Sequence, residues 1–459
     1  ISVTTDPAVA VAFNDIPFIR NHFFEQEFYD VSQVEVLRGP QGTLYGRNAT
    51  AGVVNLISAK PTDQFEAMAS VEIGNYHQRR LEGMINLPIV DDRLDIRFAG
   101  EWTKRQGYSF NAITDQRIDG RDLWSTRLSI GLKPADDLQI NFVWEHFQED
   151  DDRLRSSKQL CATDTEPTSV NGVPVPQIGS STSYGGAFDP SSYLSQGCKA
   201  ASLYAPESFG VPDGYSLPYV KAAKLTGQIN PTLDPYASTT QSTNLHVIES
   251  TVDPHYRARN ETIEFNADYI VTPALTLTSQ TAYNQDSLFS TEDYNRFNTS
   301  PGIFIPNSGH PNEISFDGVF CDPQMGCANR MVGVDLSDEH AWQLSSEFRL
   351  ASKFSGPLNF SFGGNYLHYE TEENYYVFIN ALTVYALSPL QGAYEPGVTD
   401  NHECLANHGG YIVAILGGEP SFNQCNYIDP NPITGLNNRG HNYFLSQNPY
   451  FLETYSGFG

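Results

Sequence analysis

The chain has 459 residues, of which 40% are hydrophobic, 12% aromatic and only 18% charged, and its 27 basic and 54 acidic residues give a net charge of −27. This negative charge argues against a nucleic-acid partner, because phosphate binding needs a basic surface. The longest apolar run, residues 411–416, is far shorter than the ~20 residues that a membrane-spanning helix requires. The abundance of Tyr and Phe argues against disorder. Together these features favour an all-β chain with long polar loops.

The first sixty residues combine short apolar stretches with glycine-rich turns. An apolar stretch that begins at Val31 leads into RGPQGTLYGR at 38–47, and a second apolar stretch spans 52–57. The glycines allow tight turns where backbones pack closely. The segment lacks both the Gly-Lys-Ser/Thr ending of a P-loop and the GxGxxG order of a dinucleotide fold, so nucleotide binding is not expected.

From residue 65 onward the pattern changes to a strict alternation of apolar and polar residues. In one example, Leu94, Ile96 and Phe98 alternate with Asp95 and Arg97. The pattern predicts nine β-strands of roughly 9–13 residues. They lie at about 65–73, 81–87, 94–102, 124–132, 138–144, 263–269, 275–283, 342–350 and 358–366.

Soluble β-sandwiches also alternate, but three features favour a membrane barrel. The segments match the ~9–11 residues of a tilted spanning strand. Their apolar faces often end in residues suited to an interfacial girdle, namely Trp102, Trp124, Trp144, Tyr269, Tyr283, Trp342 and Tyr366. The opposite faces carry full charges, which suit a wet or plugged lumen.

The connections between these segments alternate between short and mostly long. Short turns are expected at 88–92, 134–137, 272–274 and 353–357, and the other connections at 74–77, 106–120, 150–258, 286–338 and 371–459. Outer-membrane barrels have this arrangement, with short periplasmic turns and long surface loops.

All six cysteines fall in the long loops, without a CxxC spacing for redox or zinc chemistry. Pairing neighbours within each loop predicts the disulfides Cys161–Cys198, Cys321–Cys327 and Cys404–Cys425. Such bridges imply an oxidising compartment. The alternative is that the thiols are unpaired.

The three longest loops hold 27 acidic and 10 basic residues. They could be ordinary solvated loops or a negatively charged mouth that repels anions. The run Asp150, Asp151 and Asp152 is a weak candidate for Ca²⁺, since consecutive carboxylates do not match an EF-hand spacing.

The stretch VEVLRGPQGTLYGRN at 34–48, with GVVNLI at 52–57 and Lys60-Pro61, closely resembles the plug domain of TonB-dependent outer-membrane receptors. The resemblance implies the C-terminal part of a plug in residues 1–60 and the N-terminal part of a transmembrane antiparallel β-barrel in residues 61–459. In that family the plug sits in a 22-stranded barrel, and the TonB protein of the inner membrane pulls an N-terminal box to move it. Only nine strands are predicted here, the coupling box and the first half of the plug are missing, and Gly459 is expected inside a surface loop. An internal fragment is therefore expected, from a protein in the lipid bilayer of the outer membrane of a Gram-negative bacterium.

The resemblance also implies roles for particular residues. The expected plug core and switch comprises Glu35, Arg38, Gly39, Pro40, Gly42, Tyr45, Gly46 and Arg47. Their polar partners are expected on the lumen face of the barrel, where the candidates are Glu72, Arg97, Glu101, Arg127 and Glu264. Glu35 and Arg38 would serve either as a switch or only to stabilise the plug.

The expected function is energised uptake of a scarce ligand such as a ferric siderophore, a vitamin or a carbohydrate. Candidate ligand contacts are the loop tyrosines Tyr184, Tyr204, Tyr294, Tyr375 and Tyr376. No catalytic residue, resident cofactor or resident metal is expected, apart from the weak Ca²⁺ candidate, and iron would enter only as part of the ligand. The alternatives are a passive porin, an outer-membrane barrel enzyme or a surface adhesin, although the chain has no GxSxG or HExxH motif.

Overall fold

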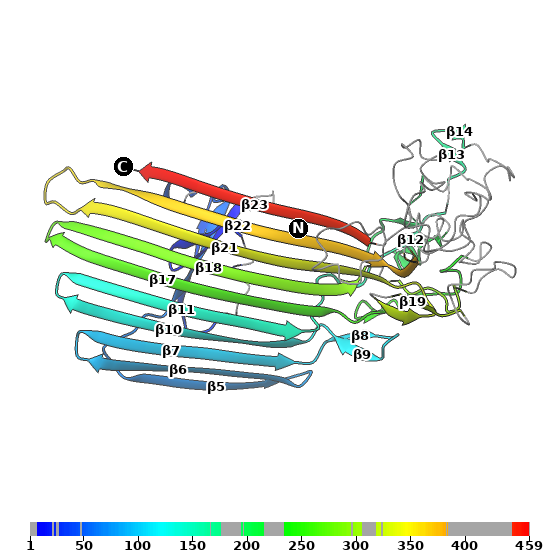
Figure 1. The fold of residues 1–459 in the computed structure, drawn as a ribbon, viewed down its shortest axis with the longest axis horizontal. Helices are drawn as coiled ribbons and strands as arrows, with labels where there is room; N and C mark the ends of the chain where they lie inside the picture. Colours follow the sequence, from blue (N-terminus) through cyan, green and yellow to red (C-terminus); the bar gives the residue numbers. More distant parts are fainter. Residues whose placement is uncertain are drawn as a thin grey trace, which may run out of the picture.

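The computed structural model describes residues 7–20, 23, 27–45, 48–165, 167–175, 194–195, 197–214, 234–294, 297–304, 318–322, 325–381, 383 and 443–458. Most of these residues lie in two β-sheets, one large and one small (Figure 1). Among the described residues, no helix is both long enough and apolar enough to cross a membrane.

The large sheet, here called the wall, has ten antiparallel strands in the order β23-β22-β21-β18-β17-β11-β10-β7-β6-β5. Neighbours along the chain pair with each other, so the wall is an up-and-down meander (Figure 1). Its strands are β5 (Glu66–Gly74), β6 (Gln78–Val90), β7 (Leu94–Arg105), β10 (Arg121–Ala135), β11 (Leu138–Asp151), β17 (His255–Thr272), β18 (Leu275–Asp293), β21 (Gly333–Ser352), β22 (Ser361–Ile379) and β23 (Tyr443–Phe458).

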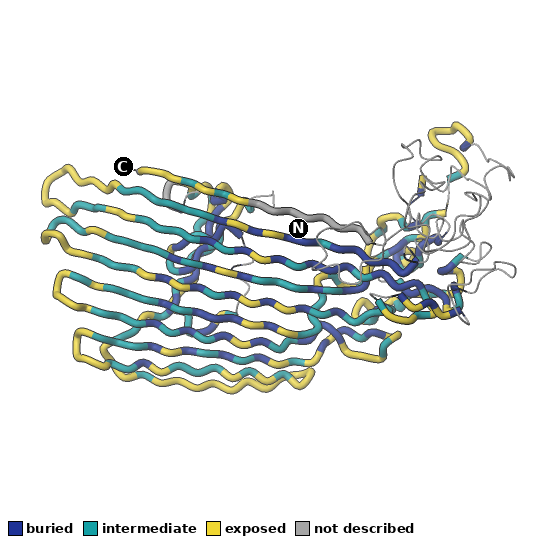
Figure 2. Tube along the Cα trace, in the orientation of Figure 1, coloured by how far each residue is buried: buried dark blue, intermediate teal, exposed yellow. Residues whose placement is uncertain are grey.

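The two faces of the wall have the polarity of a barrel in lipid. Arg97 is 6% exposed whereas its neighbour Phe98 is 45% exposed, and Glu264 is 0% exposed whereas Phe265 is 43% exposed. A soluble protein would bury the apolar face instead. The apolar side therefore faces outward, as the alternation predicts, and buried and exposed positions alternate along the strands in Figure 2.

Aromatic side chains form a band across the outer face of the wall. Trp102 and Trp124 are register partners on β7 and β10, and Trp124 lies 4.6 Å from the ring of His146 on β11. Farther along, the Trp342 ring lies 6.2 Å from Tyr283 and stacks on His368 at 4.4 Å. Aromatic rings with a polar edge are favoured at the boundary between lipid and water, and this band contains the predicted girdle residues Trp102, Trp124, Tyr283 and Trp342.

The strands are longer than the alternation predicts, and there is one more of them. The strands β18, β21 and β22 have 19, 20 and 19 residues, so the expected loops at 286–338 and 371–459 start several residues too early. Beyond the girdle neither face meets lipid, so the apolar alternation fades while the hydrogen-bonded ladder continues. The tenth strand, β23, pairs with β22 and runs to Phe458, which corrects the expectation that the chain ends within a surface loop.

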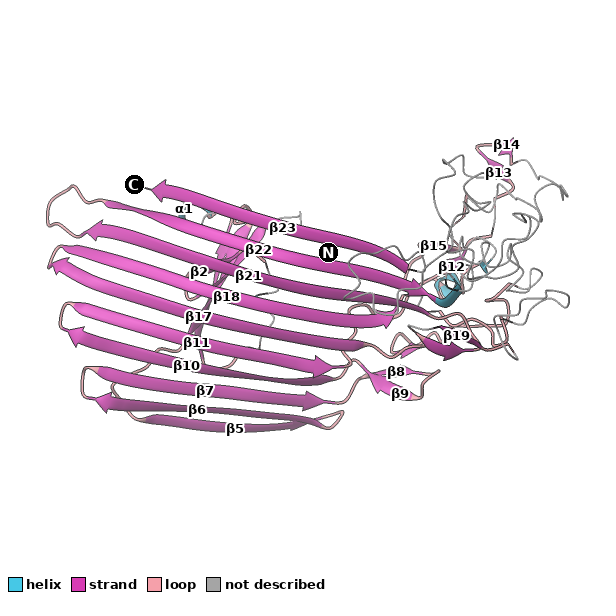
Figure 3. Ribbon diagram, viewed as in Figure 1, coloured by secondary structure: helices cyan, strands magenta, loops and turns pink. Residues whose placement is uncertain are grey.

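The short and long connections lie at opposite ends of the wall. At the turn end, three residues join Val90 to Leu94 and two residues each join Ala135 to Leu138 and Thr272 to Leu275. At the loop end, longer segments leave β7, β11, β18 and β22 (Figure 3). Their short elements are β8 (Ser109–Asn111), β9 (Gln116–Ile118), β12 (Ala162–Thr163), β13 (Ser169–Val170), β14 (Val173–Pro174), β15 (Cys198–Lys199), the 3₁₀ turn η4 (Pro206–Ser208), β16 (Val247–Ile248), β19 (Phe320–Asp322) and β20 (Gly326–Ala328).

The small sheet, here called the inner sheet, has the order β2-β1-β4-β3 and packs against the buried face of the wall. Its strands are β1 (Val9–Phe13), β2 (Ile16–Phe18), β3 (Val31–Arg38) and β4 (Gly52–Ser58), and the short helix α1 (Gly42–Tyr45) follows β3. The two apolar stretches, which begin at Val31 and at Gly52, form the antiparallel strands β3 and β4, whereas β1 and β2 were not predicted. The boundary near residue 60 stays a prediction, although β4 ends at Ser58 and β5 begins at Glu66.

Candidate functional site: the contact between inner sheet and wall

The inner sheet is attached to the wall through a short segment before β3 and another around β2. In the first, Asp30 accepts two hydrogen bonds from Arg97 of β7, at 2.8 Å from Nε and 2.6 Å from Nη2. Both side chains are more than nine-tenths buried. The other side of the guanidinium reaches Glu66 of β5 at 3.1 Å. A planar fork that pairs with a carboxylate in this way fixes orientation as well as charge.

Arg127 of β10 contacts Tyr29, the residue before Asp30, and is only 1% exposed. Its guanidinium pairs with Glu145 of the adjacent β11 at 2.9 and 3.2 Å, and donates to the backbone oxygens of Tyr29 and Asp30 at 3.3 and 3.2 Å. It also lies 4.6 Å from the centre of the Tyr29 ring and 5.3 Å from that of Phe13. Burial, and next the nearby Glu145 carboxylate, raise the pKa of the Tyr29 phenol well above its ordinary value. Tyr29 therefore stays neutral and can donate to Glu145 at 3.4 Å.

The second attachment runs along the hairpin formed by β1 and β2. Asn14 at the hairpin tip donates to Glu264 of β17 at 2.8 Å, and its backbone oxygen accepts from Gln280 of β18 at 2.9 Å. Gln343 of β21 binds the backbone of β2 and of the residue after it: it donates to the Pro17 oxygen and accepts from the Ile19 N–H, each at 2.9 Å. These bonds tie the hairpin to three wall strands.

Two further contacts complete this second attachment. Arg20 pairs with Glu339 of β21 at 2.8 Å, and the backbone oxygen of Phe23 accepts from Asn260 of β17 at 2.7 Å. The Phe23 ring also packs edge-on against Tyr369 of β22 at 6.1 Å.

Polar bonds at many points, beside one modest apolar cluster, distinguish this interface from a protein core. The described part of residues 7–58, the inner sheet with its connecting segments, is here called the inner body. The apolar cluster joins its residues Phe13, Phe18, Phe23 and Leu56 to Val143, Ala341 and Tyr369 of the wall. Each hydrogen bond adds only about 0.5–1.5 kcal/mol net, because water can replace the partner when the contact opens. Such an interface holds its position firmly but can open stepwise under a pulling force.

The predicted switch residues lie within the inner body rather than against the described part of the wall. Glu35 accepts from Gln33 at 2.7 Å and from Asn55 at 3.1 Å, while the Arg38 side chain is exposed. Within the described residues neither side chain reaches the wall, so their pairing with it stays a prediction. The alternation shows which wall residues face inward and are therefore candidate partners. It does not show which residues of the inner sheet contact them.

The glycine-rich turn after β3 behaves partly as predicted. Gly39 has φ of +85°, a conformation that a side chain would strain, and Gly42 begins α1. Pro40 lies between them and is exposed. Tyr45 is 9% exposed among small apolar residues, and burial followed by Asp15 raises the pKa of its phenol. Gly46 and Arg47 lie outside the described residues.

Of the predicted wall partners, Arg97, Arg127 and Glu264 contact the inner body and two do not. Glu72 on β5 is exposed and binds Gln78 at 2.7 Å instead. Glu101 accepts from Thr103 at 3.1 Å and lies 3.8 Å from Arg80, which in turn reaches Glu27 of the inner body at 3.4 Å. Glu101 thus acts through Arg80, and its direct contact was a wrong prediction.

Much of this contact is made by residues that were not predicted from the sequence, namely Asn14, Asp30 and Gln343. A signal for the first was present: Asn14 and Asp15 stand between two short apolar runs and both have positive φ, as in a two-residue hairpin turn. Asp30 and Gln343 give no local signal, because their partners are 67 and 326 residues away in the chain.

The loop tyrosines proposed as ligand contacts differ widely in accessibility. Tyr204 is 91% exposed and Tyr294 is 45% exposed, so both can be reached from solvent. Tyr375 is partly buried and donates to Asp335 at 3.2 Å. Tyr376 is fully buried in a cluster with Leu336 and Phe378, which corrects its assignment as a ligand contact because a core side chain cannot reach the ligand. Tyr184 lies outside the described residues.

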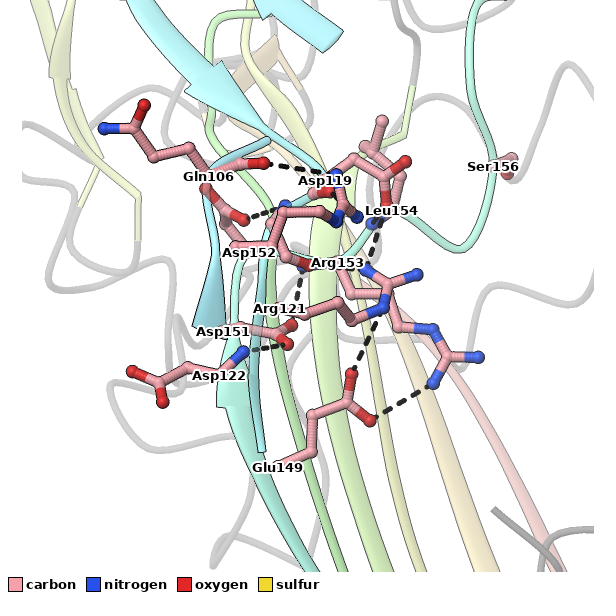
Figure 4. A network of polar contacts seen from close by, with 12 residues as sticks. Gln106, Asp119, Arg121, Asp122, Glu149, Asp151, Asp152, Arg153, Leu154 and Ser156 are labelled. Atoms are coloured by element: carbon pink, nitrogen blue, oxygen red, sulfur yellow. Dashed lines mark hydrogen bonds and ion pairs between the residues drawn. The ribbon is translucent and has the colours of Figure 1, made fainter. Parts of the chain in front are cut away.

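The three consecutive aspartates do not form a cation site. Asp150 faces outward and binds His255 at 2.9 Å, whereas Asp151 accepts from the backbone N–H groups of Asp122 and Arg153 (Figure 4). Asp152 accepts from the N–H of Gly120, and burial raises the pKa of its carboxyl. β11 ends at Asp151, and because successive side chains of a strand point to opposite faces, the carboxylates of Asp150 and Asp151 diverge. Within the described part of the chain, no three His, Cys, Asp or Glu residues are grouped as metal ligands.

Two of the predicted disulfides are present. Cys161 and Cys198 are joined with a Cα–Cα distance of 5.0 Å, and Cys321 pairs with Cys327 across the β19–β20 hairpin. Cys404–Cys425 falls outside the described residues.

Comparison with known proteins gives one family match and several partial relatives. Residues 4–53 match the family model described as TonB-dependent Receptor Plug Domain. The chain is 42% identical over 118 residues to the catecholate siderophore receptor Fiu of Escherichia coli O6:H1, covering 26% of this chain and 15% of Fiu. It is 29% identical over 126 residues to the pesticin receptor of Yersinia pestis, covering 28% of this chain and 18% of that receptor.

Solved structures include the siderophore receptor PiuA from Acinetobacter baumannii, with a TM-score of 0.48 and 14% identity over 80% of this chain and 39% of PiuA. The chain thus matches less than a fifth of the length of the two curated relatives.

Proposed function

We propose that the chain is part of a TonB-dependent receptor that serves the energised import of a ferric siderophore across the outer membrane. The inner sheet is then the plug, the wall is part of the surrounding barrel, and the contact between them is what must open for the ligand to pass. The form of that contact is the observation that carries the proposal.

The plug is held by distributed polar bonds that a pull can break in sequence. Asp30 accepts hydrogen bonds from Arg97, and the backbone oxygen of Tyr29 accepts one from Arg127. Asn14 at the hairpin tip donates to Glu264. Because these bonds are separate and lie on different wall strands, each can break without the others breaking at the same moment. The same hydrogen bonds can form again when the plug returns, because each partner residue remains on the wall.

A ferric siderophore is the substrate class supported by the relatives. One matched relative is named as a catecholate siderophore receptor and another as a pesticin receptor, which supports a transport receptor rather than an enzyme. The acidic loops disfavour strongly anionic ligands by charge alone. We therefore propose a ferric siderophore of low net charge, with vitamins and carbohydrates as the alternatives that the experiment separates.

The partner that supplies energy is proposed to be the TonB protein of a Gram-negative inner membrane. A passive porin needs no movable plug and no energy source. Dependence of uptake on the proton-motive force therefore separates import from passive diffusion.

Uptake of radioactive iron tests the proposal in cells that express the full-length receptor and lack their own siderophore receptors. We expect uptake with at least one of a catecholate and a hydroxamate siderophore, and loss of that uptake when a protonophore is added or tonB is deleted. Uptake that survives both treatments would establish a passive pore. Growth restored by a vitamin or an oligosaccharide, with no uptake of iron, would reject the siderophore assignment and leave energised import standing.

A further inference from the structure

The first residues of the long connection after β11, 152–159, lie against the wall and are here called the strap. After the strap leaves β11, the Arg153 guanidinium lies over the Tyr256 ring of β17 at 4.6 Å. Ser156 then donates from its N–H and its hydroxyl to Glu292 of β18, at 3.3 and 3.2 Å. The strap therefore crosses neighbouring wall strands instead of leaving the loop end directly, and its start is visible in Figure 4.

Arg155 attaches the strap to a third strand. Its guanidinium donates to Asp335 of β21 at 2.7 Å and to the Ser337 hydroxyl at 3.1 Å, and it lies 3.9 Å from Glu292. The Tyr375 hydroxyl of β22 donates to the other oxygen of Asp335 at 3.2 Å. One cation thus lies between two buried carboxylates of the wall, and removing it would leave both without that compensating charge.

The wall partners of the strap lie on the same face of the wall as those of the plug. Along β21, Gln343 and Glu339 contact the plug, and Ser337 and Asp335 are the next two residues of that face toward the loop end. Residues two apart on a strand lie on one face, about 6.6 Å from each other. The strap therefore lies directly beyond the plug, and a ligand that approaches the plug along this part of the wall passes it.

The strand residues beneath the strap are buried. Tyr256, Glu292 and Asp335 are 2%, 3% and 6% exposed, although the plug contacts described above lie nearer the turn end of the same strands. Side chains that would otherwise line the lumen at this level are thus covered by the strap. A ligand here meets the strap instead of the strands.

Exposed polar side chains form the side of the strap that faces away from the wall. Ser157 and Gln159 are exposed, whereas Ser156 binds the wall and the Lys158 side chain is only 3% exposed. Lys158 pairs with Glu249, farther along the same connection, at 3.4 Å, which fixes the far end of the strap. A hydroxyl and an amide are therefore held in place where they can donate hydrogen bonds.

We propose that the strap is a specificity-determining surface for the import proposed above, on which this inference rests. Ser157 and Gln159 contact the ligand, and Arg155 is a positioning residue that holds them in place. Because Asp335 and Glu292 balance the charge of Arg155, the strap offers hydrogen-bond donors without an excess of positive charge. That surface suits a ligand of low net charge whose oxygens accept hydrogen bonds, such as the iron-bound oxygens of an uncharged ferric complex.

The test measures the KM and the maximal rate of radioactive iron uptake, with ferric complexes of one catecholate and one hydroxamate, in cells that express the full-length receptor. The variant Ser157→Ala with Gln159→Ala removes the two contacts and leaves Arg155 in place. Two lost hydrogen bonds predict a KM about tenfold higher, with an unchanged maximal rate because the plug contact is intact. The matched control, Gln139→Ala with Ser355→Ala, alters two exposed residues at the turn end and should leave KM unchanged.

Arg155→Gln tests the positioning role, because it releases the strap from Asp335 without altering Ser157 or Gln159. KM should again rise about tenfold, and Arg155→Lys, which keeps the pair with Asp335, should reverse most of that rise. Adding Arg155→Gln to the double alanine variant should raise KM no further, since the contacts that it positions are already gone. Heat-modifiable migration on gels shows that each variant folds, so a KM change is not a loss of folded receptor.

Three outcomes would overturn the proposal. A KM of the double alanine variant equal to that of the control would show that the ligand does not contact the strap. Additive effects of Arg155→Gln and the alanine changes would show that Arg155 does not act through Ser157 and Gln159. A lower maximal rate at unchanged KM would assign the strap to movement of the plug. Iron import with unchanged KM rejects the strap alone, whereas no import by the unaltered receptor rejects the proposed function as well.

Discussion

Replacing Asp30 by Asn should loosen the plug without unfolding the barrel. The change removes a buried carboxylate that accepts two hydrogen bonds from Arg97, at 2.6 and 2.8 Å. Losing one member of a buried pair costs about 3–5 kcal/mol. Arg97 keeps Glu66 at 3.1 Å, a carboxylate whose side chain is 42% exposed, so some of its charge stays compensated.

We therefore expect the seated plug to lose about 2–3 kcal/mol relative to the displaced plug, a factor of roughly 30 to 150 in that equilibrium. The reporter is a cysteine at Ala341, a wall residue that is 3% exposed beneath the plug. The urea concentration at which a maleimide reaches it measures plug departure, while heat-modifiable migration shows that the barrel persists.

Asp63→Asn is the matched control, since Asp63 is exposed and accepts a hydrogen bond from the neighbouring Gln64 side chain at 3.4 Å. Its urea midpoint should equal that of the receptor with the Ala341→Cys change alone. If Asp30→Asn left the midpoint in place, or if the control shifted by as much, the polar contacts described here would not be what seats the plug.

Three further changes test other parts of the structure. Arg127→Lys keeps the charge but loses the planar fork that joins Glu145 to the plug backbone. The urea midpoint for plug departure should therefore fall, by an amount worth about 2–3 kcal/mol. An unchanged midpoint would show that the positive charge alone is enough to hold the plug. Cysteines placed at Leu128 and Ser129 should differ, with a lipid-soluble quencher reaching only a label at 128, and the reverse would invert the assignment of faces. The raised pKa of Asp152 means that the folded state holds its proton more tightly than the unfolded chain does, so the ionised carboxylate lowers stability above that pKa and this loss disappears as pH falls through it. Asp152→Asn should thus raise the melting temperature at pH 7 and converge with the unaltered receptor near pH 3, whereas a variant less stable at pH 7 would contradict the reasoning.

The sequence alone determined the wall and the direction in which its faces point. Alternation such as Leu94, Ile96 and Phe98 against Asp95 and Arg97 follows from the two-residue period of a strand, and a strand is present at each of the nine predicted positions. The turns and the pairing of Cys161 with Cys198 could also be predicted from the sequence, because each joins residues within one connection between strands.

Only the tertiary structure decided which plug residues meet the wall. The motif around Glu35 and Arg38 is conspicuous in the sequence, yet the contacts are made by Asn14 and Asp30. Their wall partners lie 250 and 67 residues away in the chain, respectively. A polar residue on a lumen face has the same local pattern whether it meets the plug or water. The strand extensions beyond the girdle were equally invisible, because hydrophobic periodicity records where lipid lies, whereas the backbone ladder continues wherever a neighbouring strand is present.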